Sequence, residues 1–124
     1  IADKFHFPGF MRGKQVQEML AMSDVYIMPS VSEPFGISPL EAMQVGCPSI
    51  ISHQSGCAEI LQHAIKTDYW DIDAMADAIY AIVKYPAMYK SLHELGMAEV
   101  NNIKWSDAGL KVRRIYDGVI NHTL

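Results

Sequence analysis

Two acidic residues, Glu33 and Glu41, lie in the stretch SEPFGISPLEAM, residues 32–43. A carboxylate only accepts hydrogen bonds, and each can take two O–H donors, so a pair of carboxylates suits the vicinal hydroxyls of a sugar. A buried strand would not need these acids, and an exposed loop would not need the apolar residues around them. The residue types therefore raise the hypothesis of a ligand that carries hydroxyl groups.

The same stretch predicts the start of a helix. Ser38, Pro39 and Glu41 form an S-x-x-E capping box with proline at the first helical position, which places the helix start near Ser38. The positive end of the helix dipole would favour an anion such as a phosphate there, bound by the backbone N–H groups of Gly36, Ile37 and Ser38. Gly36 would let the ligand approach the backbone closely. Phosphate and hydroxyl recognition together indicate a nucleotide sugar. Two simpler interpretations remain open: Glu41 could only cap the helix, and Glu33 could be a solvated charge in a loop.

The elements around this stretch predict an α/β fold. VYIM at 25–28 and SII at 49–51 are apolar runs typical of buried strands, and PLEAMQVG between them fits a helix that Gly46 ends. Two such strands joined through a helix predict a parallel βαβ unit. Ligands of parallel sheets bind beyond the carboxyl ends of the strands, which is where SEPFGIS lies.

The flanking segments extend this pattern. FHF at 5–7 is predicted to be a short strand, and residues 14–22 are predicted to be a helix. Downstream, the helical spacing of DIDAMADAIYAIVKY predicts a helix capped by Asp71, and a second helix over 86–102. We expect one domain over residues 1–124 whose C-terminal part is helical.

A third helix is expected after Lys104. Ser106 is predicted to be its N-cap, with Trp105 and Leu110 at the two positions of a hydrophobic staple.

Composition narrows the classes of function. The chain has 124 residues, half of them hydrophobic, and a net charge of −4 with scattered basic residues, so nucleic acid is not an expected partner. Cys47 and Cys57 lack a metal-ligand spacing and fit free thiols in a reducing cytoplasm. No apolar run is long enough to cross a membrane. Because the chain opens on IADKFHFPG without Met, we expect it to be a piece of a longer protein.

The run PSVSEPFGISPLEAMQVGCPSII resembles the signature of retaining glycosyltransferases of the GT-B fold, in the group 1 family that includes sucrose synthase, bacterial glycogen synthase and cell-envelope mannosyltransferases. That signature is a glutamate, seven residues and a second glutamate, then Ala-Met, Gly-x-Pro and a strand. The residues that match it are Glu33, Pro34, Phe35, Gly36, Glu41, Ala42, Met43, Gly46 and Pro48. FHFPGF, SGCAEI and KWSDAG resemble further family segments, so the resemblance covers nearly the whole chain.

This resemblance implies a partial C-terminal domain of a GT-B fold, with a Rossmann-like parallel sheet flanked by helices. It implies transfer of a hexose, with retention, from a UDP- or GDP-type nucleotide-diphosphate sugar to a hydroxyl of a glycan or lipid-linked acceptor. Glu33 would be the catalytic residue against the donor sugar, and Glu41 would accept bonds from the ribose hydroxyls. The implied donor-binding residues are Phe35, Gly36, Ile37, Ser38, Glu41 and Gly56. No cofactor and no metal are implied.

The sequence also departs from the family pattern. Ser55 and Ala58 stand where the family has a glycine and a proline, so the shape of that loop is an open question. The family's diphosphate-binding Arg and Lys and its N-terminal acceptor domain are not found here, and Arg12 and Lys14 are predicted to be solvated instead. The chain alone is therefore expected to be inactive. Acceptor binding, and peripheral membrane association if the full-length protein has it, are assigned to the missing N-terminal domain.

Two other functions stay open: a nucleotide-sugar 2-epimerase on the same fold, and a non-catalytic binding module.

Three local features have simple interpretations. Asp71-Ile72-Asp73 imitates a metal-binding DxD motif but lies where a helix cap is expected. Cys47 fits a small packed residue, and His53 fits a loop histidine with an ordinary hydrogen bond.

Overall fold

Within residues 1–121, three short parallel strands form one sheet. The strands β1 (Tyr26–Met28), β2 (Ser49–Ser52) and β3 (Ile65–Thr67) lie in the order β1-β2-β3 in a computed structural model that describes residues 1–121. Ile27 pairs with Ile50, and Ile50 pairs with Ile65. The predicted α/β class and the predicted parallel βαβ unit are confirmed.

Helices surround this sheet and fill most of the rest of the chain. They are η1 (Ala2–Lys4), α1 (Lys14–Ala21), α2 (Ile37–Gln44), η2 (Gly56–Glu59), α3 (Ile72–Lys84), α4 (Pro86–Asn101) and α5 (Trp105–Ile120). Asp71 caps α3, because its carboxylate accepts a hydrogen bond from the Ala74 N–H at 2.9 Å. That cap was predicted, and it explains Asp71 without a metal.

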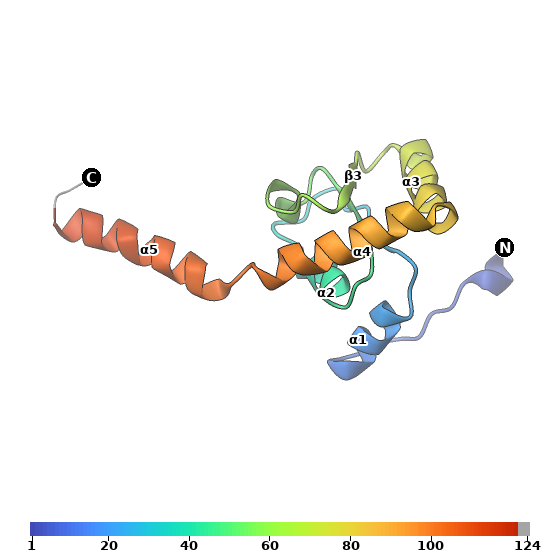
Figure 1. The fold of residues 1–124 in the computed structure, drawn as a ribbon, viewed down its shortest axis with the longest axis horizontal. Coiled ribbons are helices and arrows are strands. Elements are labelled where there is room, and N and C mark those ends of the chain that lie inside the picture. The colour runs from blue at the N-terminus through green and yellow to red at the C-terminus, as the bar shows by residue number, and fades with distance from the viewer. Residues whose placement is uncertain (122–124) are drawn as a thin grey trace.

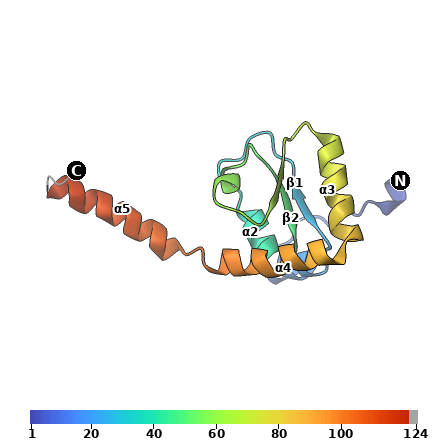
Figure 2. The ribbon, with the colours of Figure 1, turned by 45° about the horizontal axis from the view of Figure 1, so that its top comes forward.

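The core lies on both faces of the sheet. Figure 2 shows the strands between α3 on one side and α2 on the other, with α4 running beside α2. Met28 and Ile51 pack into the core cluster that also holds Met43, Leu61 and Val100. Side chains alternate between the faces of a strand, so Ile50 belongs to the opposite face, where Ile50 and Ile82 are both almost completely buried.

The predicted strand at residues 5–7 is wrong. These residues follow η1 as irregular chain, and the side chains of Phe5 and Phe7 are 62% and 90% exposed. A strand needs a neighbour to satisfy its backbone groups, and no strand of the described residues pairs with this segment. Apolar content alone therefore misled the prediction.

Two predicted helix caps are also wrong. Helix α2 begins at Ile37 with Gly36 at the cap, and α5 begins at Trp105 with Lys104 at the cap, so Ser38 and Ser106 lie inside the helices. The staple of Trp105 and Leu110 does not form either, since both side chains are exposed. Each helix begins before the serine that could have capped it.

Helix α5 differs from the other long helices in its surroundings. Figure 1 shows it extending away from the α/β body, on the opposite side from the N-terminal segment. It has no buried residue. Within residues 1–121, no helix is both long enough and apolar enough to cross a membrane.

Candidate functional site

The loop that joins β1 to α2, residues 29–36, lies at the carboxyl end of β1 and is called here the β1–α2 loop. Carboxyl ends of parallel strands are the usual ligand-binding edge of such sheets. The loop carries Glu33, and the helix that follows it carries Glu41. The structure therefore brings both predicted acids to the edge where a ligand is expected.

Backbone hydrogen bonds fix the β1–α2 loop against the segment after β2. The Gly56 N–H donates to the Glu33 carbonyl at 2.9 Å, and the Cys57 N–H donates to the Phe35 carbonyl at 2.6 Å. Glu33 also forms a parallel bridge with Ser55. These bonds continue the sheet beyond the regular strands, so the loop has a defined position before any ligand binds.

Two glycines make this close pairing feasible. Gly36 has a φ of +90°, and a Cβ there would lie 2.9 Å from the Met28 Cε atom and 3.2 Å from the Glu33 Cγ atom. A Cβ on Gly56 would collide with the backbone of Pro34 and lie 3.0 Å from the Phe35 Cα atom. Gly36 and Gly56 were predicted to be donor-binding, and the structure gives each of them a packing reason as well.

The start of α2 presents free backbone donors at the same edge. The N–H groups of Ile37 and Ser38 lie in the first turn, where a helix has no internal acceptors. Pro39, the next residue, has no N–H to offer. The Ser38 hydroxyl accepts a hydrogen bond from the Tyr26 hydroxyl at 2.7 Å, so Ser38 has its N–H, and not a free hydroxyl, available for a ligand.

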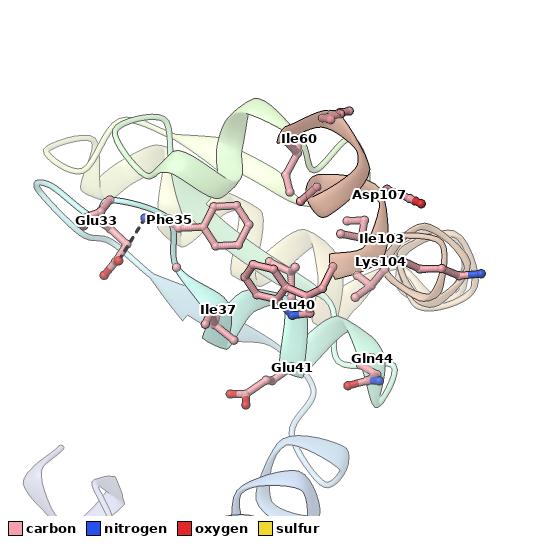
Figure 3. Close-up of a pocket in the computed structure, with 16 residues that line it drawn as sticks. Glu33, Phe35, Ile37, Leu40, Glu41, Gln44, Ile60, Ile103, Lys104 and Asp107 are labelled. Carbon is pink, nitrogen blue, oxygen red and sulfur yellow. Dashed lines mark hydrogen bonds between the residues drawn. The ribbon is translucent and has the colours of Figure 1, made fainter. Parts of the chain in front are cut away.

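The two carboxylates lie on one flank of the loop. In Figure 3 both point away from the apolar side chains of Phe35 and Leu40. The carboxylate of the half-buried Glu33 accepts a long hydrogen bond of 3.4 Å from the Phe35 N–H, whereas the exposed carboxylate of Glu41 has no hydrogen-bond partner among residues 1–121. Because Ser38 is not the cap, the interpretation of Glu41 as a capping-box residue is wrong, and its carboxylate is free to meet a ligand.

An apolar hollow lies on the other flank. Its volume is about 1080 Å³, and its wall is formed mainly by Phe35, Leu40, Ile60, Val100, Ile103 and Trp105. The charged residues of its lining are Glu33 and Glu41 on one side and Lys104, Asp107 and Lys111 on the other. Apolar walls suit an apolar occupant, so sugar hydroxyls fit the carboxylates, and a phosphate fits the α2 N-terminus, better than either fits the hollow.

The two unusual residues of the loop at 55–60 fit its observed shape. Ser55 has a φ of −91°, which needs no glycine, and its buried hydroxyl donates to the Ser52 carbonyl at 2.6 Å. The Ala58 N–H donates to the Ser55 carbonyl at 3.0 Å. A proline at position 58 could not make that bond. Both substitutions therefore keep the loop closed by local hydrogen bonds.

Cys47 and His53 are two other side chains that the sequence singles out. Cys47 precedes β2, at the opposite edge of the sheet from the β1–α2 loop, and His53 follows β2. Burial and, second, the charge of Asp24 raise the pKa of the Cys47 thiol to about 11, so it stays protonated and packs as a small apolar residue. His53 is exposed, and its backbone N–H donates to the Thr67 carbonyl at 2.9 Å, while its ring has no bond within the described residues. No cluster of three or more metal-ligand side chains occurs in residues 1–121.

Sequence reasoning missed two features of this region. Strand β3 at Ile65–Thr67 went unpredicted, although its apolar and β-branched ends are typical of a short strand. Glu99 on α4 was also missed; its carboxylate accepts hydrogen bonds from the N–H groups of Gln62 and His63 at 2.7 and 2.9 Å. No local pattern links residues this far apart, so only the fold shows that contact.

Fold and site together define an α/β domain that offers two carboxylates and a helix start at the edge of a parallel sheet. Residues 1–98 match the family described as glycosyl transferases group 1. Because the match spans most of the sequence, the chain belongs to this family. The arrangement of strands and helices is that of the C-terminal domain of a GT-B glycosyltransferase.

Individual relatives agree with the family. An uncharacterized glycosyltransferase of Methanocaldococcus jannaschii is 40% identical over 65 residues, which cover 52% of this chain and 17% of the relative. The 2-deoxystreptamine N-acetyl-D-glucosaminyltransferase of Niallia circulans is 32% identical over 103 residues, which cover 81% of this chain and 26% of that relative. Sucrose-phosphate synthase of Thermosynechococcus elongatus superposes with a TM-score of 0.80 at 26% identity, over 98% of this chain and 31% of that one. The chain thus spans less than a third of the length of each of these proteins.

Proposed function

We propose that the β1–α2 loop binds the nucleotide-diphosphate sugar donor of a retaining hexosyltransferase. The observation that carries this proposal is the shared flank of Glu33 and Glu41, with the first-turn N–H groups of Ile37 and Ser38 at the same edge. In this proposal Glu33 accepts hydrogen bonds from the donor sugar and Glu41 accepts them from the ribose hydroxyls. The diphosphate lies at the α2 N-terminus, near Phe35, Gly36 and Gly56, where backbone donors and the helix dipole favour negative charge.

The chain's contribution to the reaction follows from that placement. As the bond from the sugar C1 to the diphosphate oxygen breaks, negative charge grows on the leaving phosphate, and the α2 N-terminus stabilises it. The acceptor hydroxyl attacks C1 from the same face, its oxygen forms the new bond, and its proton passes to the leaving phosphate. Attack on that face retains the anomeric configuration. Glu33 keeps the sugar oriented for this step.

The rest of the reaction is proposed to depend on segments outside this sequence. These would supply the Arg and Lys that neutralise the diphosphate, and the domain that holds a glycan or lipid-linked acceptor. The reaction is proposed to take place in the cytoplasm. The relatives support a transferase over a 2-epimerase, since the names of both curated proteins above are those of transferases. Turnover of the donor without an acceptor would reverse that choice.

The direct test is an NMR titration of the isotopically labelled chain with UDP, GDP and ADP. We expect one nucleotide to shift the backbone amides of residues 33–41 selectively, and Glu41→Ala to abolish the shifts. Glu94→Ala is the matched control, because Glu94 is an exposed acid on α4 that pairs only loosely with Lys90 at 3.9 Å. If millimolar nucleotide leaves these amides unmoved, both here and in a longer chain that includes the acceptor domain, the donor-site proposal is wrong and a non-catalytic module is favoured.

A further inference from the structure

Glu99 is the side chain that ties the segment after β2 to helix α4. One carboxylate oxygen, Oε1, accepts a hydrogen bond from the Gln62 N–H at 2.7 Å. The other, Oε2, accepts from the His63 N–H at 2.9 Å and lies 3.1 Å from the His63 Nδ1 atom. The Glu99 side chain is only 14% exposed. Bonds to a charged acceptor are roughly twice as strong as neutral ones, so this contact is a firm anchor.

The anchored segment is the one that holds the β1–α2 loop. Its beginning bonds to the loop through the Gly56 and Cys57 N–H groups, which donate to Glu33 and Phe35. Its end bonds to Glu99 through Gln62 and His63. Between the two ends lies the short helix η2 with the buried Cys57, followed by the buried Leu61. Residues 55–63 therefore form a connection, only nine residues long, from α4 to the loop that carries Glu33.

We propose that Glu99 is a positioning residue, which holds the β1–α2 loop in its binding geometry through residues 55–63. Glu99 lies on another element and acts only through this connection. The importance of Glu99 for donor binding rests on the function proposed above. The effect of Glu99 on the position of the loop is independent of that function. No other carboxylate within residues 1–121 accepts two backbone N–H bonds from this segment.

The test measures the loop without a ligand. In Glu99→Ala, we expect the Gly56 and Cys57 amides to exchange with solvent at least about five-fold faster, because residues 55–63 have lost the hydrogen bonds that hold their C-terminal end. The amides of β2 that bond to β1 report global unfolding, so they should speed up only by the factor that the lost unfolding free energy gives, at least about five-fold less than Gly56 and Cys57. Glu99→Gln retains one carbonyl oxygen that can accept a backbone N–H, so it should restore part of the protection.

Two controls separate positioning from general destabilisation. Glu94→Ala removes an exposed acid from the same helix and should leave all these rates unchanged. Ile82→Val weakens the core on the far face of the sheet, so it should speed by one common factor the body amides that exchange through global unfolding. Uniform acceleration in Glu99→Ala, or unchanged Gly56 and Cys57 rates, would overturn the positioning role.

A second measurement connects the loop to the donor site. If the wild-type chain binds a nucleotide, Glu99→Ala should weaken that binding by at least about three-fold, and Glu99→Gln should recover part of the loss. Unaltered affinity in Glu99→Ala, alongside faster Gly56 exchange, would show that the loop position does not matter for the donor. If the wild type binds none, the proposed function fails, while the exchange rates still decide whether Glu99 holds the loop.

Discussion

Helices α3 and α5 carry the same kind of amphipathic pattern but lie in opposite surroundings. In α3 the apolar face contacts β2 and β3, and Ile82 is 1% exposed. In α5 the large apolar side chains are all at least 48% exposed; they are Trp105, Leu110, Val112, Ile115, Tyr116, Val119 and Ile120. Figure 1 shows the same contrast, with α3 against the body and α5 clear of it.

This difference separates what a sequence pattern predicts from what makes a helix stable. The pattern predicts that a segment can form a helix with an apolar face, and both segments do so. Stability comes mainly from covering that face, because isolated helices of this length are marginal in water. The amides of the α/β body are therefore expected to be protected from exchange, and its core to be sensitive to mutation, whereas neither is expected of α5 by itself.

The largest expected effect is a core truncation in the body. Ile51 on β2 is 1% exposed and packs within the core cluster, so Ile51→Ala removes buried methyl groups and leaves a cavity. We expect a loss of about 3 to 4 kcal/mol in the free energy of unfolding, measured by urea denaturation. Ile51→Val should lose about 1 kcal/mol. A loss below about 1 kcal/mol for the alanine variant would mean that the body is loosely packed.

Most of the body could be predicted from the sequence because its signals are local. The apolar run before Pro29, the Gly46 helix end and the Asp71 cap each act through neighbours in sequence, and all three are found in the structure. The failures have physical reasons. FHF at 5–7 has strand-like residues but no strand beside it, and Ser38 lost its capping role because Gly36 takes the left-handed conformation that begins the helix.

The candidate site was predictable only in part. Glu33 and Glu41 were singled out by residue type and spacing, and the fold places both at the carboxyl end of β1. Their common flank depends on the backbone pairing of Glu33 with Ser55, which joins segments that are distant in sequence. The contact of Glu99 with Gln62 and His63 is likewise a property of the folded chain.

A smaller effect is expected from replacing Glu99, which lies in the last turn of α4, where the body meets the chain that leads to α5. Burial raises the pKa of Glu99, but the bonds from Gln62 and His63 outweigh it and hold that pKa below the ordinary glutamate value. A carboxyl whose folded pKa is depressed stabilises the fold above its unfolded pKa, and this stability is lost as the pH falls through the folded pKa. We expect Glu99→Gln to cost about 1 to 2 kcal/mol at neutral pH.

The pH dependence of that cost is the sharper readout. The difference in unfolding free energy between wild type and Glu99→Gln should shrink as the pH falls from the ordinary glutamate pKa through the lower folded pKa of Glu99, because the wild-type carboxyl then becomes neutral as well. Urea denaturation at a series of pH values measures it, and Glu94→Gln is the matched control. A difference that stays constant down to the acid limit would show that the charge of Glu99 does not contribute.

The smallest expected effect lies on α5. Val112→Ala truncates an apolar side chain that is 48% exposed on a helix without buried residues, so the unfolding free energy should stay within about 0.5 kcal/mol of wild type. The same urea experiment as for Ile51→Ala gives the direct comparison. Amides of α5 should also exchange far faster than those of β2, because their helix opens without unfolding the body. If Val112→Ala instead cost as much as a core truncation, the apolar face of α5 would have to be covered in solution, and α5 would share the stability of α3 after all.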